Sequence, residues 1–501
     1  MPRSRTQKDE IILVTGESAK GILNGLEDLC SESDLLSEGF LQWLSYQTQR
    51  SLKRQEPYRV ILVANGEQDL KKKLLQTIKL IRMSPERGFS FEPIGIFYGV
   101  GVSRDRVAFL FPGQGSQYVD MGRDLASIYG KAFSAWERAS SLVFDGQRII
   151  DKVFAAEGAK DEELAEMERV LAGSDWTHPC IGTVSGSMLN LLEAMGLVPD
   201  AVTGHSWGDI TAYYAAGAIS FIEMLQIARK RGALAAFEPS TRGGGVLIVY
   251  ADIETAKSII SESHVEAWIA NHNTPTQIVL SARVVDFERL EEAFDRKGIS
   301  VKIIPISAAP HCPIMDEISR LLRDYLEDFS FQRLRYPLYC TLFGRVVPND
   351  PEVMKKVITT QMVKTVKFVD QITNMYRDGI RTFVEVGPDA VRTKFVGQIL
   401  ADKPHAAIPL DNRKEDGHRV FLSGVAELLR TGRSLNLDVL WEDYDAPVRP
   451  RSVTPKSSEV GGVGVTRKEA EDISRTWTLE VAKAESILVS RSRVDETAGE
   501  F

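Results

Sequence analysis

The chain has 501 residues, of which 43% are hydrophobic and 26% are charged, and its formal net charge is −8. A chain of this length exceeds one ordinary hydrophobic core, so we expect two to four folded units. The acidic balance gives no general case for nucleic-acid binding. No run approaches the roughly 18 apolar residues that a membrane span needs. The basic N-terminus has no apolar segment behind it, so we expect a cytoplasmic protein with no membrane partner.

The cysteines argue against a disulfide framework and against a zinc site. The chain contains Cys30, Cys180, Cys312 and Cys340, and none of them belongs to a C-x-x-C pair. Reduced thiols in a cytosolic setting are therefore expected. We expect neither a bound metal nor a cofactor.

The first predicted unit spans residues 1–104. Short buried strands are expected at 11–15 and 59–64. Helical spacing follows the first strand, and it returns at 70–81 after the second. This alternation indicates a small α/β domain.

A second unit begins with the apolar run 107–111, which is typical of a parallel strand buried on both faces. Strands and helices then alternate over 105–235 and again over 306–432, which favours a layered α/β core. Residues 433–501 are expected to be a partly disordered linker or tail, because prolines, serines and glycines accumulate there. A weak helical pattern lies within this tail at about 467–488.

The intervening segment 236–305 has a different pattern. Its order of elements is predicted to be strand, helix, strand, strand, helix, strand, which is the split ferredoxin-like order. The helices are expected at about 253–263 and 286–297, and the middle strands at 266–270 and 277–281.

The strongest chemical signal is Gly204-His205-Ser206-Trp207-Gly208, which lies between an apolar segment and a helical pattern. A G-x-S-x-G sequence in that context predicts a tight strand-to-helix turn that raises the serine hydroxyl above a sheet. The N–H of Trp207 would then lie at a helix N-terminus, where it can stabilise an oxyanion. A chance match in a surface loop is the alternative.

Three further positions could serve such a nucleophile. Gln114 lies in a glycine-rich turn after the 107–111 strand that could bind an anion, although taken alone the segment is better explained as a plain strand-to-helix turn. His311, in a proline-flanked turn, is a candidate base for Ser206. Arg231 could receive a carboxylate if it is turned inward, although a surface arginine remains an alternative.

These motifs together carry a family resemblance. They are Phe-Pro-Gly-Gln-Gly-Ser-Gln at 111–117, Gly-His-Ser-Trp-Gly-Asp at 204–209, Arg231, the His311 turn and Val-Glu-Val-Gly-Pro at 384–388. In order and spacing they resemble the malonyl-CoA:acyl carrier protein transacylases and the acyltransferase domains of polyketide and polyunsaturated fatty acid synthases. The enediyne and polyunsaturated fatty acid types are the more similar. The resemblance implies an α/β-hydrolase-like parallel-sheet core with an inserted ferredoxin-like subdomain, and it likens residues 1–104 to the linker before the acyltransferase.

The resemblance also implies roles for individual residues. Ser206 would carry the acyl group, and His311 would take and return the proton. The N–H groups of Gln114 and Trp207 would form the oxyanion hole, and Arg231 would pair with the free carboxylate of malonyl-CoA. Further residues match positions that line the site in relatives: Asn271, Asn273, Pro310 and Lys367. In the family a backbone carbonyl orients the histidine, and we match that position to Lys367.

Two departures from the family pattern bear on specificity. Asp209 replaces the usual glutamate. Ala308-Ala309-Pro310-His311 matches neither the His-Ala-Phe-His pattern of malonyl enzymes nor the Tyr-Ala-Ser-His pattern of methylmalonyl enzymes. Trp207 could supply the missing bulk, and malonyl remains the default acyl group.

Three functions follow as hypotheses. The first is a transfer of malonyl from coenzyme A to an acyl carrier protein. The chain shows no ketosynthase or carrier-protein motif, so we expect the carrier to be supplied in trans, with ketosynthase or other synthase subunits as possible partners. The second is a thioesterase or editing hydrolase that uses Ser206 and His311. The third is a non-catalytic docking subunit, which the intact candidate site residues disfavour.

Overall fold

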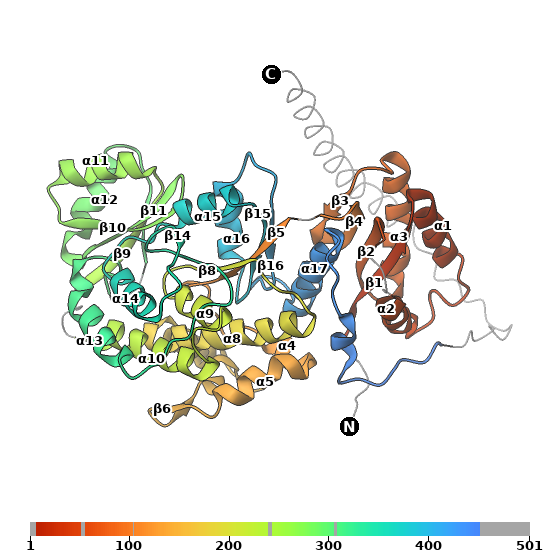
Figure 1. Ribbon diagram of the computed structural model, residues 1–501, viewed down its shortest axis with the longest axis horizontal. Helices are drawn as coiled ribbons and strands as arrows, with labels where there is room; N and C mark the ends of the chain where they lie inside the picture. Colours follow the sequence, from red (N-terminus) through yellow and green to blue (C-terminus); the bar gives the residue numbers. More distant parts are fainter. Residues whose placement is uncertain (1–6, 52–55, 104, 239–242, 305–307, 451–501) are drawn as a thin grey trace, which may run out of the picture. The chain divides into compact units, whose positions relative to one another are not determined.

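The computed structural model describes residues 7–51, 56–103, 105–238, 243–304 and 308–450. These residues belong to one compact unit. The helix predicted at 467–488 lies outside the described residues. Three larger sheets organise the described part of the chain (Figure 1). The strands of the central sheet come from two stretches of sequence, which lie before and after the segment that forms the third sheet.

The N-terminal sheet is antiparallel and has the strand order β1-β2-β4-β3. Its elements are β1 (Asp9–Gly16), α1 (Ala19–Cys30), α2 (Phe40–Ser51), β2 (Tyr58–Asn65), α3 (Glu67–Met83), β3 (Phe89–Phe91), η1 (Glu92–Ile94) and β4 (Ile96–Val100). The predicted strands and the predicted helix at 70–81 are confirmed. The two short strands β3 and β4 were not predicted, because a proline and glycines interrupt their pattern.

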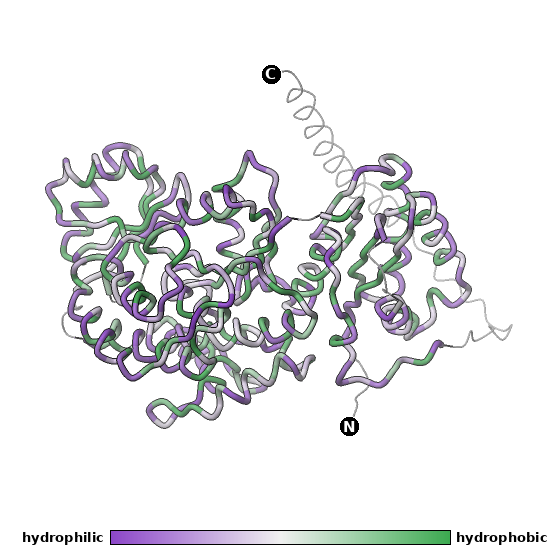
Figure 2. Tube along the Cα trace, viewed as in Figure 1, coloured by the Kyte–Doolittle hydropathy of each residue, from purple (hydrophilic) through white to green (hydrophobic). Residues whose placement is uncertain are grey.

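Side chains alternate across this sheet, as the strand period of two requires. Ile12 and Leu62 face a core formed with α1, α2 and α3. Ile11 and Ile61 face the opposite way and join the main core, where helix α17 (Gly417–Arg430) packs against β1, β2 and β4. Figure 2 shows the resulting concentration of hydrophobic residues along these strands.

The central sheet has the order β14-β13-β8-β5-β15-β16 and is parallel except for its edge strand β14. Its strands are β5 (Arg106–Phe111), β8 (Ala201–Gly204), β13 (Leu338–Cys340), β14 (Arg345–Val346), β15 (Ile380–Glu385) and β16 (Ala406–Pro409). The predicted α/β architecture with a parallel-sheet core is confirmed. Strand β5 lies in the middle of the sheet, which explains its continuous apolar sequence.

Helices cover both faces of the central sheet. Phe109 and Phe111 of β5 face one cluster, which includes α4 (Arg123–Ile128), α5 (Gly130–Ala139), α8 (Ser174–Ala194), α9 (Gly208–Ala215) and α10 (Phe221–Phe237). Ala108 and Leu110 face a second cluster with α15 (Phe368–Arg377) and α16 (Val391–Ile399). Further elements of the same layers are β6 (Val143–Phe144), β7 (Gln147–Arg148), α6 (Ile150–Val153), α7 (Asp161–Ala172), η4 (Pro313–Met315), α13 (Asp316–Leu326) and α14 (Pro351–Gln361).

The segment 244–304 forms a separate antiparallel sheet with the order β10-β11-β9-β12. Its elements are β9 (Gly244–Val249), α11 (Ile253–Ser263), β10 (Ala267–Thr274), β11 (Gln277–Arg283), η3 (Val284–Asp286), α12 (Phe287–Asp295) and β12 (Val301–Ile304). This is the predicted order of elements. A single bridge between Asn271 and Val366 joins this sheet to the segment before α15.

The first residues of the predicted tail are packed against the rest of the chain. Residues Leu437–Trp441 form the short helix η5, and most of its apolar side chains are buried. The Trp441 indole donates a hydrogen bond to Gln49 of α2 (2.9 Å), and the Tyr444 hydroxyl donates one to the Ile128 carbonyl (2.7 Å). The tail therefore begins later than 433. Among the described helices, none is both long and apolar enough to cross a membrane.

Candidate active site

Ser206 lies on a tight turn between β8 and α9, as the sequence predicted. A Cβ placed on Gly204 would lie 2.1 Å from the Asp209 backbone nitrogen, and one on Gly208 would lie 2.4 Å from the Phe111 carbonyl oxygen. Only glycine allows these approaches. Ser206 itself has a φ of 56°, a strained value for a residue with a side chain. The flanking glycines thus hold the serine in a conformation that it would not choose alone.

His311 forms a hydrogen bond with this serine. Its Nε2 lies 2.7 Å from the Ser206 Oγ, and its Nδ1 lies 2.9 Å from the Gln361 carbonyl oxygen. Because a carbonyl only accepts, Nδ1 carries the proton and Nε2 presents its lone pair to the serine hydroxyl. The geometry is that of a nucleophile and a base with a third group that orients the base.

The orienting carbonyl corrects one sequence-based match. We matched it to Lys367, but it belongs to Gln361, at the end of α14. Lys367 is exposed, and its backbone N–H donates to Thr341. The His311 backbone is held too, because its N–H donates to the Met362 carbonyl (2.8 Å). In the same turn the half-buried Pro310 accepts a hydrogen bond from Ser281 of β11 through its carbonyl.

Burial keeps His311 neutral. Its side chain is 3% exposed, and desolvation together with the positive charge of Arg231 lowers its pKa to about 4. The neutral imidazole is the form that can accept the serine proton.

Arg231 is turned inward and lacks an acidic partner. It lies on α10, is 4% exposed, and donates from Nη2 to the Gln361 side-chain oxygen (3.1 Å). Its Nε has no hydrogen-bond partner, and within the described part of the chain no carboxylate lies within 4.0 Å of the guanidinium. Burial lowers the Arg231 pKa to about 10, against the opposing effect of Asp209, so the group stays cationic at neutral pH. Asp209 is thus the nearby negative charge, but it is not bonded to the guanidinium, and a buried cation with an unused donor can accept an anion as a direct partner.

Gln361 connects these groups and was missed by sequence reasoning. Its side-chain nitrogen donates to the Ser206 carbonyl (2.6 Å), to Asp209 Oδ2 (2.7 Å) and to the Thr341 hydroxyl (2.8 Å). Burial raises the Asp209 pKa to about 6 despite these donors. No local pattern distinguishes Gln361 from any other glutamine at the end of a helix, so only the fold reveals its place.

The Gln114 turn lies directly beside the nucleophile turn. A Cβ on Gly113 would be 2.5 Å from the His205 carbonyl oxygen. The Gln114 side chain is tied to the region where α8 begins, accepting from the Ser174 hydroxyl (3.1 Å) and donating to the Ala172 carbonyl (3.3 Å). Among the residues that the structure describes, no acceptor is bonded to the backbone N–H of Gln114 or to that of Trp207. Both N–H groups are therefore free for a substrate oxyanion.

The Trp207 side chain is fully buried beneath the turn. Its indole stacks on the ring of His178, with centroids 5.0 Å apart and planes at 19°. His178 is also buried, and desolvation followed by the charge of Arg231 holds its pKa well below the usual range. The pair forms an aromatic wall close to Arg231.

The two asparagines have different environments. Asn273 is buried, with Oδ1 2.8 Å from His205 Nε2 and Nδ2 donating to Gln277 (3.1 Å). Its amide thus holds His205 in place, which does not favour the predicted contact with substrate. Asn271 is half-buried, and its backbone pairs with Val366. His205 itself contacts Asn273 and not the Ser206 hydroxyl, as expected of a structural histidine.

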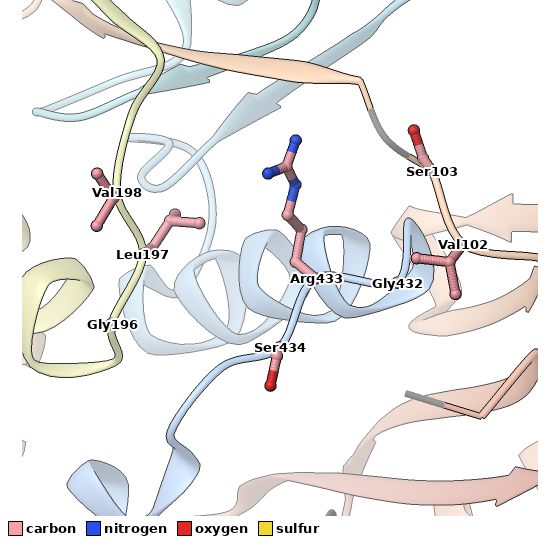
Figure 3. Close-up of a pocket in the computed structure, with 8 residues that line it drawn as sticks. All are labelled: Val102, Ser103, Gly196, Leu197, Val198, Gly432, Arg433 and Ser434. Carbon is pink, nitrogen blue, oxygen red and sulfur yellow. The ribbon is translucent and has the colours of Figure 1, made fainter. Parts of the chain in front are cut away.

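A separate hollow of about 590 Å³ lies away from these residues (Figure 3). Its lining comes from three segments: Val102, Ser103, Gly196, Leu197, Val198, Gly432, Arg433 and Ser434. Arg433, which projects between the other lining residues in Figure 3, donates to the Asp105 carbonyl. None of the candidate site residues lines this hollow.

Comparison with known proteins places the chain in a family. The acyl transferase domain model matches residues 108–434, so the chain belongs to the acyl transferase domain family. It is 28% identical over 307 residues to the malonyl CoA-acyl carrier protein transacylase of Bacillus subtilis (strain 168). The aligned region covers 59% of this chain and 90% of that relative. The family resemblance that the sequence motifs indicated is thereby confirmed.

Other relatives are longer. The chain spans 5%, 11%, 39% and 20% of the lengths of four proteins of polyketide or polyunsaturated fatty acid synthesis. Among solved structures, the acyl transferase domain of ZmaA has a TM-score of 0.74 at 19% identity, covering 88% of this chain and 98% of that one. A malonyl-transacylase solved in complex with a type II polyketide synthase acyl-carrier protein has a TM-score of 0.57 at 21% identity, covering 64% and 99%. At such low sequence identity, the structural likeness establishes the fold alone.

Proposed function

We propose that this chain moves a malonyl group from coenzyme A to the phosphopantetheine thiol of an acyl carrier protein, through an ester on Ser206. The observation that carries the proposal is the hydrogen-bonded pair of Ser206 and His311 beside Arg231, a buried cation without an acidic partner. The reaction uses no cofactor, because the coenzyme A thioester is itself the substrate.

In the first half-reaction Ser206 Oγ attacks the thioester carbonyl carbon, and its proton passes to His311 Nε2. The oxyanion of the tetrahedral intermediate accepts hydrogen bonds from the N–H groups of Gln114 and Trp207. The carbon–sulfur bond then breaks, and the leaving thiolate takes the proton from His311. Malonyl-Ser206 and coenzyme A are the products.

The second half-reaction is the reverse with a different thiol. The phosphopantetheine thiol gives its proton to His311 and attacks the Ser206 ester. The carbon–oxygen bond breaks, and Ser206 recovers the proton from His311. The acceptor is supplied by another chain or by another part of a larger synthase.

The free carboxylate of the acyl group would pair with Arg231. A bidentate arginine–carboxylate pair is strong in a desolvated site, and here it would give Arg231 a directly bonded carboxylate in addition to the more distant charge of Asp209. Once the carboxylate neutralises Arg231, the field that lowers the His311 pKa weakens, so His311 becomes a stronger base when the correct substrate is bound.

The size limit on the acyl group is proposed to come from the aromatic wall of Trp207 and His178. In the segment that precedes the histidine, Ala308 and Ala309 are buried and small, and Pro310 is half-buried. One methyl group changes binding in such a pocket by only about 1–3 kcal/mol, so malonyl and methylmalonyl are expected to differ by preference. We also interpret 244–304 as the inserted ferredoxin-like subdomain and residues 1–104 as the preceding linker.

The decisive test is to incubate the protein with radiolabelled malonyl-CoA and then with an acyl carrier protein. We expect a covalent label that moves to the carrier, and no label on the Ser206→Ala variant. Loss of the label mainly to water would favour the hydrolase alternative, which the family match does not support and which assigns no role to Arg231. Methylmalonyl-CoA in the same assay measures the acyl preference.

The buried histidine predicts an unusual pH dependence. Because a lowered pKa keeps His311 neutral in acid, kcat/KM for acylation of Ser206 should stay level from pH 8 to about pH 5 and fall as pH approaches 4. An ordinary histidine would lose activity from about pH 6.5 downward. A midpoint near that ordinary value in the measured profile would contradict the described environment of His311.

A further inference from the structure

The motifs around 111–117 and 384–388 are far apart in sequence but touch in the structure. A Cβ on Gly387 would lie 2.5 Å from Pro112 Cγ. The Val386 N–H donates to the Leu110 carbonyl (2.8 Å), since β15 and β5 are neighbouring parallel strands. The second motif therefore leads directly to the turn that holds Gln114.

Consecutive carbonyl groups of that turn are all occupied. The Gly113 carbonyl accepts from the Ser116 hydroxyl (2.8 Å), the Gln114 carbonyl from Arg392 Nη2 (3.4 Å) and the Gly115 carbonyl from Arg413 Nη2 (3.0 Å). A trans peptide points its N–H opposite to its carbonyl. Holding the Gly113 carbonyl therefore aims the Gln114 N–H, and holding the next carbonyls prevents the turn from rotating.

Acidic residues at the end of β15 and just after it support both arginines: Glu385 bonds to the backbone of Arg392, and Asp389 bonds to the side chain of Arg413. Glu385 accepts from the backbone N–H groups of Arg392 (3.0 Å) and Thr393 (2.7 Å), so it caps the start of α16 and sets the position of Arg392. Arg392 is 4% exposed. Burial lowers its pKa, and the negative charges of Glu385 and Asp389 oppose that shift.

Arg413 is held in a similar way. Its Nε donates to Asp389 Oδ2 (2.7 Å), and the Asp389 backbone N–H donates to Asp411 (3.1 Å). Asp411 also accepts from the Tyr118 hydroxyl, which belongs to the chain just beyond the turn. Each arginine thus reaches the turn from a support fixed by further hydrogen bonds.

We propose that Arg392 and Arg413 are positioning residues that hold the 113–116 turn with the Gln114 N–H aimed at the oxyanion formed on Ser206. Neither arginine touches the acyl group. They act through the carbonyls of Gln114 and Gly115. This role also explains the Val-Glu-Val-Gly-Pro motif, because its Glu385 supports Arg392 although the motif does not contribute a group to the reaction itself. This inference rests on the proposed acyl transfer.

The test compares single-turnover acylation of Ser206 with equilibrium binding of malonyl-CoA in Arg413→Gln and Arg392→Lys variants of the full chain. An oxyanion donor acts only in the transition state, and losing one costs about 10²- to 10³-fold in rate. A misaimed donor should cost less, so we expect acylation to slow about 10- to 100-fold with the dissociation constant unchanged. Arg413→Lys, which keeps a donor, should recover part of the rate.

Arg320→Gln is the matched control, because Arg320 makes a two-pronged ion pair with Glu317 on the exposed side of α13, away from the site. Thermal unfolding shows whether each variant is folded. The Arg413 side chain is 38% exposed, so its variants should fold even if the variant at the buried Arg392 does not. Folded variants that acylate at the parent rate, or that lose only binding, would overturn the positioning role. If the parent itself takes no label, the proposed function fails instead.

Discussion

Replacing Arg231 with alanine is expected to shift the proposed acyl preference from malonyl towards acetyl. The variant loses the cation that would pair with the malonyl carboxylate, and the charged acyl group then enters a desolvated pocket without a partner. Removing one member of such a pair costs about 3–5 kcal/mol, so kcat/KM for malonyl-CoA should fall at least 100-fold. Acetyl-CoA carries no carboxylate, so its kcat/KM should be unchanged or should rise. Steady-state transfer to an acyl carrier protein with both substrates gives the ratio.

The same variant provides an internal check through His311. After burial, the charge of Arg231 is the second cause that lowers the His311 pKa. Its removal should therefore raise that pKa, so that acetyl transfer begins to fall at a higher pH when the solution is acidified. Arg231→Lys is the companion variant, because it keeps the charge but not the planar fork. An Arg231→Ala protein that folds normally and still prefers malonyl by the parent ratio would refute the carboxylate site.

Replacing His311 with glutamine is expected to cause the largest loss among the variants that keep the nucleophile. Glutamine can fill part of the space and bond to the Gln361 carbonyl, but it cannot take the proton from Ser206. General base catalysis contributes typically 10²- to 10⁴-fold, so acylation should slow by about that factor. Stopped-flow or quenched labelling of Ser206 measures the rate.

A matched control separates loss of the base from damage to the turn. His405 is partly exposed, and among the described residues its side chain bonds only to the nearby Lys403 carbonyl (2.8 Å), so His405→Gln should acylate at the parent rate. The His311→Gln variant should also regain speed at high pH, where hydroxide replaces the missing base. Acylation at the parent rate without His311 would remove the histidine from the mechanism.

Local backbone rules explain what the sequence could predict about the site. Gly204 and Gly208 are required wherever a strand and a helix approach so closely, and this requirement is written in five consecutive residues. The strand at 107–111 was equally clear, because burial on both faces demands a continuous apolar run. The elements of 244–304 followed from their periodicity alone.

Long-range contacts explain what could not be predicted. The Gln361 side chain bonds to the Ser206 carbonyl, although the two residues are 155 positions apart in sequence. No local sequence pattern distinguishes this glutamine from one whose side chain is solvated. The mismatch at Lys367 has the same cause: the carbonyl that orients His311 is chosen by where α14 ends against the turn. The burial of Leu437–Trp441 was hidden too, because it depends on a partner in α2 that lies far back in the chain.

By itself the sequence determined the tight turn that presents Ser206, the candidate nucleophile, and the family to which the chain belongs, because a G-x-S-x-G turn and a set of spaced motifs constrain backbone and residue type locally. The tertiary structure decided which atoms lie together: it gave His311 its tautomer, left Arg231 with no directly bonded carboxylate among the described residues, and placed Arg392 and Arg413 on the turn of Gln114. These arrangements arise because parallel strands bring segments that are distant in sequence to the same edge of the central sheet. Which of their atoms then lie within hydrogen-bond distance depends on the packing of the whole fold, and no local pattern contains that information.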